Sequence, residues 1–198
     1  MKKLVFSIVA SISIICGAMS QQATKNLAEA KAMYNSGNIH EARFCLQQAL
    51  NDINIAIGNE ILKIIPSKLG NMPAIEAEDN VAVTNFGIAA LMISRNYMAD
   101  STLNASLQII GDSPMLAGIN TILTLPMFTS DPNQKRIRVG TYKALLQKNT
   151  DGTQTTWDVQ IPVGSTLITL NCKGEYDEKT VIAMANSIPI DQIARYLQ

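Results

Sequence analysis

Apolar residues recur every three or four positions in the first third of the chain, which is the spacing of an amphipathic helix. A first helix is predicted over 24–35, and Ser36-Gly37-Asn38 interrupts it. A second helix is predicted over 39–64 and should end before Pro66, because the residue before a proline avoids the helical conformation. The two helices should form a hairpin. The apolar positions of the second helix are Ala42, Cys45, Leu46, Ala49, Ile53, Ala56, Ile57, Ile61 and Ile64.

The apolar pattern changes near residue 87. Before it, the segment 66–80 contains two prolines, a glycine and three acids and is predicted to be a linker. After it, short runs rich in β-branched residues alternate with turn residues, which is typical of strands. In the last of these runs, Ile168, Leu170 and Cys172 alternate with mostly polar neighbours, as in a half-buried antiparallel strand. Strands are predicted over 87–100, 101–112, 135–140, 141–149, 153–163 and 165–174.

Two further helices are predicted, over 114–125 and 177–188, with a short final turn after the second. Because strands follow strands without alternating helices, the order of elements favours the α+β class over a parallel α/β fold. We expect an N-terminal helical hairpin packed on a mostly antiparallel sheet of about six strands, with the two helices covering its apolar face. The expected organisation is a signal peptide at 1–20, the hairpin at 21–65, the linker at 66–80 and the α+β domain at 81–198.

Residues 1–20 have the pattern of a secretory signal peptide. Lys2 and Lys3 precede an apolar run over 4–15, and Ala18-Met19-Ser20 supplies small residues at the cleavage site. The run is short for a membrane span, which needs about 20 apolar residues. We therefore expect export to the periplasm or the cell exterior, with no transmembrane segment in the mature chain.

The three cysteines raise two separate questions. Cys16 follows Ile15 rather than a small residue, which disfavours lipidation. Cys45 and Cys172 would remain after export, and an oxidising compartment permits one disulfide between them. Each lies on the apolar side of a predicted element, and free cysteine is commonly a small buried hydrophobe. We expect two buried free thiols, with the disulfide as the alternative.

The charge balance narrows the choice of partners. The chain has 16 basic and 16 acidic residues, and Lys2 and Lys3 are the only charged residues within 1–20, so the mature net charge would be −2. Without a basic surplus there is little electrostatic attraction to phosphates, and we expect no nucleic-acid partner. The partners expected instead are another envelope protein or an apolar ligand.

The sequence contains no recognisable catalytic signature. Its single histidine, His40, lies in the turn of the predicted hairpin, away from any nucleophile motif. His40 and Cys45 are five residues apart and fall on different helix faces, so no metal site is expected. The scattered glycines form no phosphate-binding loop, so no cofactor is expected. Asp112, Asp158 and Glu175 are the acids that an alternative, carboxylate-based hydrolase would use.

The helix predicted over 114–125 carries the candidate partner face. Ser113 is a good N-cap and Pro114 a good first helical residue, so Asp112-Ser113-Pro114 is interpreted as a helix start rather than a reactive turn. This helix is apolar on most sides. Either it is buried between the sheet and the hairpin, or part of its surface is open to a partner. The candidate face consists of Met115, Ile119, Ile122, Met127 and Phe128.

Residues 30–50, AKAMYNSGNIHEARFCLQQAL, resemble one tetratricopeptide repeat. Such repeats bury their faces against neighbours, usually in arrays of roughly three or more units, and no second copy is found in this chain. The resemblance implies a helical hairpin packed on another part of the protein, with peptide binding in a repeat groove as the alternative. The matching positions are Ala30, Tyr34, Gly37, Asn38, Glu41, Ala42, Ala49 and Leu50.

Over about 60–198 the chain is similar to an uncharacterised family of exported bacterial proteins. That family has no assigned activity, so the resemblance implies the fold and export only. The order of elements also distantly resembles the PsbP/Mog1 group of small α+β binding modules. The motifs behind the family resemblance are ILKIIPSKLGNMP, ISRNYMA, GDSPMLAGI, RIRVGTYKALLQ and TLITLNCKGEYDEKTVIAMANSI.

Three hypotheses for the function follow. The leading one is an exported, non-enzymatic module that binds a protein or an apolar ligand through the helix within 113–128 or through the N-terminal hairpin. One alternative is an exported hydrolase with a carboxylate-based site. The other is an envelope-assembly factor.

Overall fold

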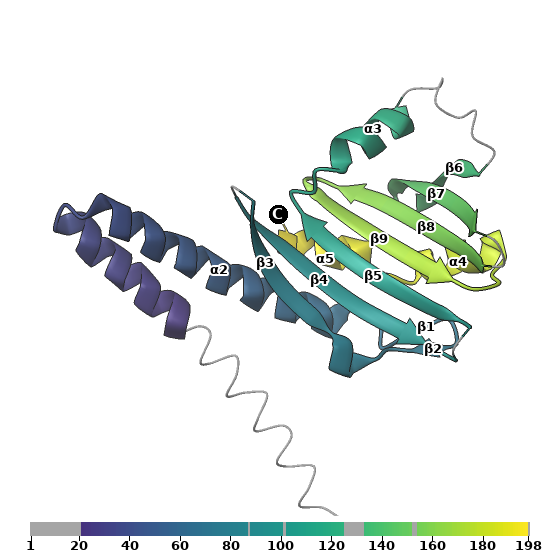
Figure 1. Cartoon of the computed structure of the whole chain (residues 1–198), viewed down its shortest axis with the longest axis horizontal. Helices are drawn as coiled ribbons and strands as arrows, with labels where there is room; N and C mark the ends of the chain where they lie inside the picture. The colour runs from purple at the N-terminus through teal and green to yellow at the C-terminus, as the bar shows by residue number, and fades with distance from the viewer. Residues whose placement is uncertain (1–20, 87, 101, 125–132, 152–153, 198) are drawn as a thin grey trace, which may run out of the picture.

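The computed structural model describes residues 21–197, except 87, 101, 125–132 and 152–153 (Figure 1). The predicted signal peptide lies outside this range. No helix in the described part of the chain has the length and apolar character that a membrane span requires.

An antiparallel sheet of seven strands lies at the centre of the described chain, in the order β3-β4-β5-β9-β8-β7-β6. Each strand is antiparallel to its neighbours. This confirms the expected α+β fold, a helical hairpin on a mostly antiparallel sheet. The strands are β3 (Asn80–Phe86), β4 (Ile88–Met98), β5 (Asn104–Gly111), β6 (Gln134–Val139), β7 (Tyr142–Asp151), β8 (Gln154–Val163) and β9 (Thr166–Lys173).

The strand that sequence analysis missed is β3. It pairs with β4 from Asn80, opposite Ser94, to Phe86, opposite Ile88, and forms one edge of the sheet. The predicted linker also contains regular structure, namely β1 (Lys68–Leu69), β2 (Met72–Pro73) and the 3₁₀ turn η1 (Glu76–Glu78). Leu69 and Met72 are fully buried in the main core, which explains why this proline- and glycine-containing segment is fixed against the domain.

The two faces of the sheet are covered differently. The main core lies on one face, where apolar side chains of the strands pack against α2 (Ile39–Ile64), α4 (Glu178–Asn186) and α5 (Ile190–Leu197). Helix α3 (Leu116–Thr124) lies on the opposite face, at one end of the strands (Figure 1). The expectation that both covering helices share the apolar face is therefore wrong for α3. The rest of that second face carries mostly polar side chains.

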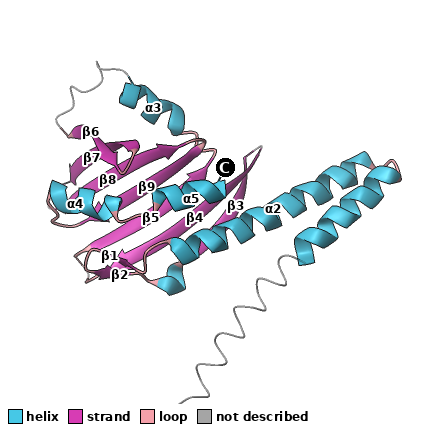
Figure 2. Cartoon of the chain, turned by 180° about the vertical axis from the view of Figure 1, so that it is seen from behind, coloured by secondary structure: helices cyan, strands magenta, loops and turns pink. Residues whose placement is uncertain are grey.

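The N-terminal hairpin extends well beyond the sheet (Figures 1 and 2). Its first helix, 21–35, runs along the N-terminal half of α2, while α2 itself also contacts β3, β4 and α5. Small side chains allow the two helices to approach closely, and Asn26 Nδ2 donates to Asp52 Oδ2 over 2.8 Å. The buried small residues are Ala23, Ala30, Ala42, Cys45 and Ala49.

Candidate functional site

The predicted partner face on α3 is largely covered. Ile119 is only 4% exposed and packs with Leu123 against Leu145 and Leu167 of the sheet. Ile122 is half-buried, whereas Met115 is 55% exposed. Met127 and Phe128 lie outside the described residues. The structure thus favours the buried alternative for Ile119, and this helix presents no apolar surface of the expected size within the described range.

The turn before α3 differs from a simple N-cap. Asp112 has a φ of 49°, a left-handed conformation that Asp tolerates better than most residues. Ser113 is buried, and its hydroxyl accepts from the backbone N–H of Met115 at 3.4 Å. The helix begins only at Leu116, so Pro114 and Met115 form a turn ahead of it. The segment therefore leads into the helix through a turn, and the helix starts about half a turn later than the cap pattern predicts.

Exposed apolar side chains gather on the N-terminal hairpin instead. Of the ten large hydrophobic residues exposed in the described chain, seven belong to the hairpin, with exposed fractions between 40% and 66%. Four of them follow one another along α2 at intervals of seven, four and three residues, and we call these four the α2 stripe. They are Ile39, Leu46, Leu50 and Ile53. Leu46 and Ile53 belong to the apolar positions predicted for this helix, whereas Ile39 and Leu50 do not.

A groove of about 430 Å³ adjoins the α2 stripe, and we call it the hairpin groove. Leu27 of the first helix lines one side, and Ile53 and Ile57 of α2 line another. Tyr196 of α5 closes the end nearest the sheet. The lining is mainly apolar, with Asp52 and Glu60 as its acids. The hairpin groove therefore extends the exposed apolar surface of the hairpin toward the body of the domain.

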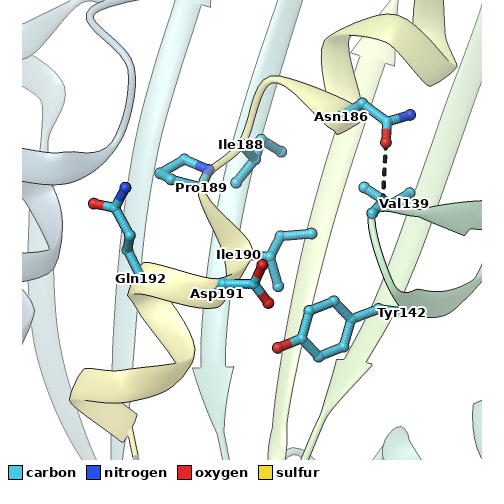
Figure 3. Close-up of a pocket in the computed structure, with 9 residues that line it drawn as sticks. Val139, Tyr142, Asn186, Ile188, Pro189, Ile190, Asp191 and Gln192 are labelled. Carbon is cyan, nitrogen blue, oxygen red and sulfur yellow. Dashed lines mark hydrogen bonds between the residues drawn. The ribbon is translucent and has the colours of Figure 1, made fainter.

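A smaller pocket of about 210 Å³ lies between the β6–β7 turn and the segment joining α4 to α5 (Figure 3). Asn186 Oδ1 accepts from the backbone N–H of Gly140 at 2.9 Å, and its Nδ2 donates to the Ile182 carbonyl. Burial and the neighbouring Asp191 carboxylate raise the pKa of Tyr142. Asn186 fixes the turn. The other polar side chains of the pocket are the Tyr142 phenol, the Asp191 carboxylate and the Gln192 amide.

A buried polar cluster lies at the C-terminal end of α2, and we call it the β4 clamp. Arg95 Nε donates to Asp79 Oδ1 at 2.9 Å, its Nη2 binds the other carboxylate oxygen, and its Nη1 donates to the Ile65 carbonyl at 2.8 Å. Tyr97 Oη donates to the Pro66 carbonyl at 2.9 Å. Each charged group is satisfied within the clamp, so its role is to fasten α2 and the following segment to β4.

The acids proposed for a hydrolase are not buried. Asp112 and Glu175 are exposed, and the half-buried Asp158 carboxylate accepts from the side-chain amides of Asn149 and Asn171. Every Asp and Glu in the described ranges is at least partly exposed. Those ranges also contain no group of three His, Cys, Asp or Glu side chains placed to hold a metal ion. His40 is exposed at the start of α2.

Both remaining cysteines are buried and unbonded, as expected. Burial raises the pKa of Cys172 to about 12, with a further contribution from Asp158. Burial likewise raises the pKa of Tyr97 to about 12. Neither group is poised to react at neutral pH, because the thiolate or phenolate form is disfavoured.

The buried Cys172 thiol and Tyr97 hydroxyl predict a loss of stability at alkaline pH. Above the ordinary values of 9.0 for Cys172 and 10.0 for Tyr97, the unfolded chain releases protons that the folded chain retains. The free energy of unfolding should therefore fall between about pH 9 and 12, by on the order of 1.4 kcal/mol per pH unit for each group. Urea unfolding at pH 8 to 11 measures this decline. In Cys172→Ala the free energy of unfolding should fall less steeply with pH. Equal slopes in both proteins would contradict the assignment.

Comparison with known proteins found no relative. No family model matches the chain, and neither a curated protein nor a solved structure matches it significantly. The resemblances to an exported bacterial family, to a tetratricopeptide repeat and to the PsbP/Mog1 group therefore remain predictions.

Proposed function

We propose that this protein is an exported, non-enzymatic interaction module and that its projecting helical hairpin binds a protein partner. The observation that carries the proposal is the gathering of exposed large apolar side chains on one projecting element. These side chains are Leu27, Tyr34, Ile39, Leu46, Leu50 and Ile53. Phe44 is exposed too, but its position two residues before Leu46 places it on another side of α2.

Two physical arguments support a protein partner. Scattered exposed hydrophobic residues are normal on a soluble domain, but a contiguous group marks an interaction surface. The helical spacing of the α2 stripe also matches the way an amphipathic helix presents residues to a groove or to a second helix. A protein surface can cover such an elongated stripe, whereas a small apolar ligand would occupy only the hairpin groove.

Export remains part of the proposal because it rests on the pattern of residues 1–20. The hydrolase alternative requires two close acids in a sheltered cleft, and the acids described above are not arranged in that way. The envelope-assembly alternative uses the same surface as the leading proposal. The identity of the bound protein distinguishes the two.

A photo-reactive amino acid at Leu46 tests the proposal in cells that express the full chain. We expect irradiation to cross-link a protein to this position, because Leu46 belongs to the α2 stripe and its side chain is exposed. Gln108, exposed on the open polar face of the sheet, is the matched control position and should give at least about ten times less adduct, because that face offers little apolar area. Equal adducts at both positions, or none at Leu46, would contradict the proposal.

A further inference from the structure

Six apolar residues of α2 follow the repeat of a coiled coil; four are exposed, and two, Ile57 and Ile64, are half-buried beside the main core. Ile39, Leu46 and Ile53 are seven residues apart, and Leu50, Ile57 and Ile64 form a second series of the same period. The two series alternate at intervals of four and three, which defines a seam that packs against another helix with the same repeat. Because the seam begins in the α2 stripe and continues through Ile57 in the hairpin groove, its natural occupant is a helix at least as long as α2.

Two charged residues complete the seam at opposite ends. Arg43 stands one repeat before Leu50, and Glu60 stands one repeat after Ile53. A charge at a seam position selects the register and direction of the partner helix, because an unpaired charge in the contact is unfavourable. The partner must therefore place an acid opposite Arg43 and a base opposite Glu60.

We propose that the partner is a second copy of this chain, packed antiparallel along α2 about a two-fold axis near Asn51 and Asp52. This inference rests on the proposed function of the hairpin. In that register, Leu50 lies opposite Ile53 of the second copy, and Arg43 lies opposite Glu60 of the second copy. Symmetry repeats each pair, as in any two-fold interface.

The other simple registers leave the charges unmatched. Parallel packing places Arg43 against Arg43. A shift by one repeat toward the hairpin tip places Arg43 against Ile53, and the opposite shift places Leu50 against Glu60. Charge complementarity thus selects one arrangement of two identical chains. The existing Glu60 ion pair with Lys63 is solvent-exposed, and such pairs are weak enough for the carboxylate to accept a second cation.

Two grooves adjoin the seam, and Tyr196 of α5 lines both of them. The hairpin groove runs from Leu27 and Ile53 to Glu60 and Tyr196. A second groove, of about 480 Å³, continues beyond it and is lined by Ile64, Gln192, Arg195 and Tyr196. Figure 2 shows α2 with the first helix on one side and α5 on the other.

The dimer would cover the large apolar side chains that the hairpin exposes. The six side chains Leu27, Tyr34, Ile39, Leu46, Leu50 and Ile53 are between 40% and 66% exposed. Together they would form the apolar centre of the dimer interface. A standard interface buries about 800 Å² on each partner. Tyr196 and the walls of the two grooves would contribute to the area around that centre.

Sedimentation equilibrium of the purified full chain tests the dimer. We expect the wild-type protein to be dimeric at micromolar concentration. Leu46→Asp should weaken dimerisation by at least about 100-fold, because it places a charge in a buried contact. Phe44→Asp is the matched control, since Phe44 is equally exposed but lies outside the seam, and it should remain dimeric. Circular dichroism verifies that each variant is folded.

Charge reversal tests the register. Arg43→Glu and Glu60→Arg should each weaken the dimer by about tenfold or more, and the double variant should return close to the wild-type affinity. A monomeric wild-type chain, equal loss in Phe44→Asp and Leu46→Asp, or no recovery in the double variant would overturn the inference.

The cross-linking experiment separates the two proposals. If adducts at Leu46 contain a different protein and the purified chain is monomeric, the inference fails and the proposed function stands. If Leu46 gives no adduct and the chain is monomeric, both fail. An adduct with the mass of two copies supports both.

Discussion

Replacing Arg95 with methionine should lower the free energy of unfolding by about 3–5 kcal/mol, because it leaves a partly buried carboxylate without its partner. Arg95 and Asp79 have side chains only 7% and 15% exposed, and the guanidinium also satisfies the Ile65 carbonyl. The variant loses both the ion pair and the bond that holds the end of α2 to β4. Urea unfolding followed by circular dichroism measures the effect.

A surface ion pair provides the control for this prediction. Lys135 and Glu178 also form an ion pair, but their side chains are 55% and 36% exposed. Lys135→Met should therefore change stability by less than about 1 kcal/mol. The double variant Arg95→Met/Asp79→Leu should recover part of the loss, because it removes the orphaned charge. Similar losses in Arg95→Met and Lys135→Met would show that the β4 clamp does not have the role assigned to it.

Two glycines within helices should respond to alanine with opposite signs. A Cβ on Gly58 would collide with the Val81 side chain and lie 3.2 Å from Leu91 Cδ1. Overpacking there should cost about 1–3 kcal/mol, which exceeds the helix-propensity gain of about 1 kcal/mol. A Cβ on Gly118 in α3 would meet no described atom within 4 Å beyond its own turn of helix, so Gly118→Ala should stabilise the protein by about 0.5–1 kcal/mol.

Thermal and urea unfolding of both alanine variants measures this pair. The sign of the stability change in Gly58→Ala reports whether α2 lies as close to β3 and β4 as the structure shows. If Gly58→Ala stabilised the protein as much as Gly118→Ala, the contact between hairpin and sheet would be looser than described.

The helices and most strands could be predicted from the sequence because their periods are strong. The break at Ser36-Gly37-Asn38 and the stop before Pro66 fixed the hairpin. Strand β3 was missed because its alternation is short and follows a segment with two prolines and a glycine, a composition that locally indicates a linker. Pairing with β4 over its whole length decides its conformation, and such non-local pairing leaves little trace in a single sequence.

The surroundings of each apolar helix face could not be predicted. Periodicity shows that α2 and α3 have apolar sides, but it does not show what covers them. One residue does indicate what covers α3. Leu167 is a large apolar residue on the mostly polar side of its strand, and Ile119 of α3 packs on it. The outer half of α2 has the same period as its inner half, yet only the inner half meets the sheet. The exposed surface therefore emerged only from the three-dimensional arrangement.

The sheet order also has a consequence for folding kinetics. Strands β3-β4-β5 form one set of sequential neighbours and β6-β7-β8-β9 form another, and only the β5–β9 pair joins them. Leu107 lies opposite Leu170 in that pair, so its formation must close a long chain segment. Because such closure is entropically unfavourable, local hairpins should form early, and pairing of β5 with β9 should limit the folding rate. Substitutions at Leu107 or Leu170 should then slow folding more than equally destabilising ones in α5.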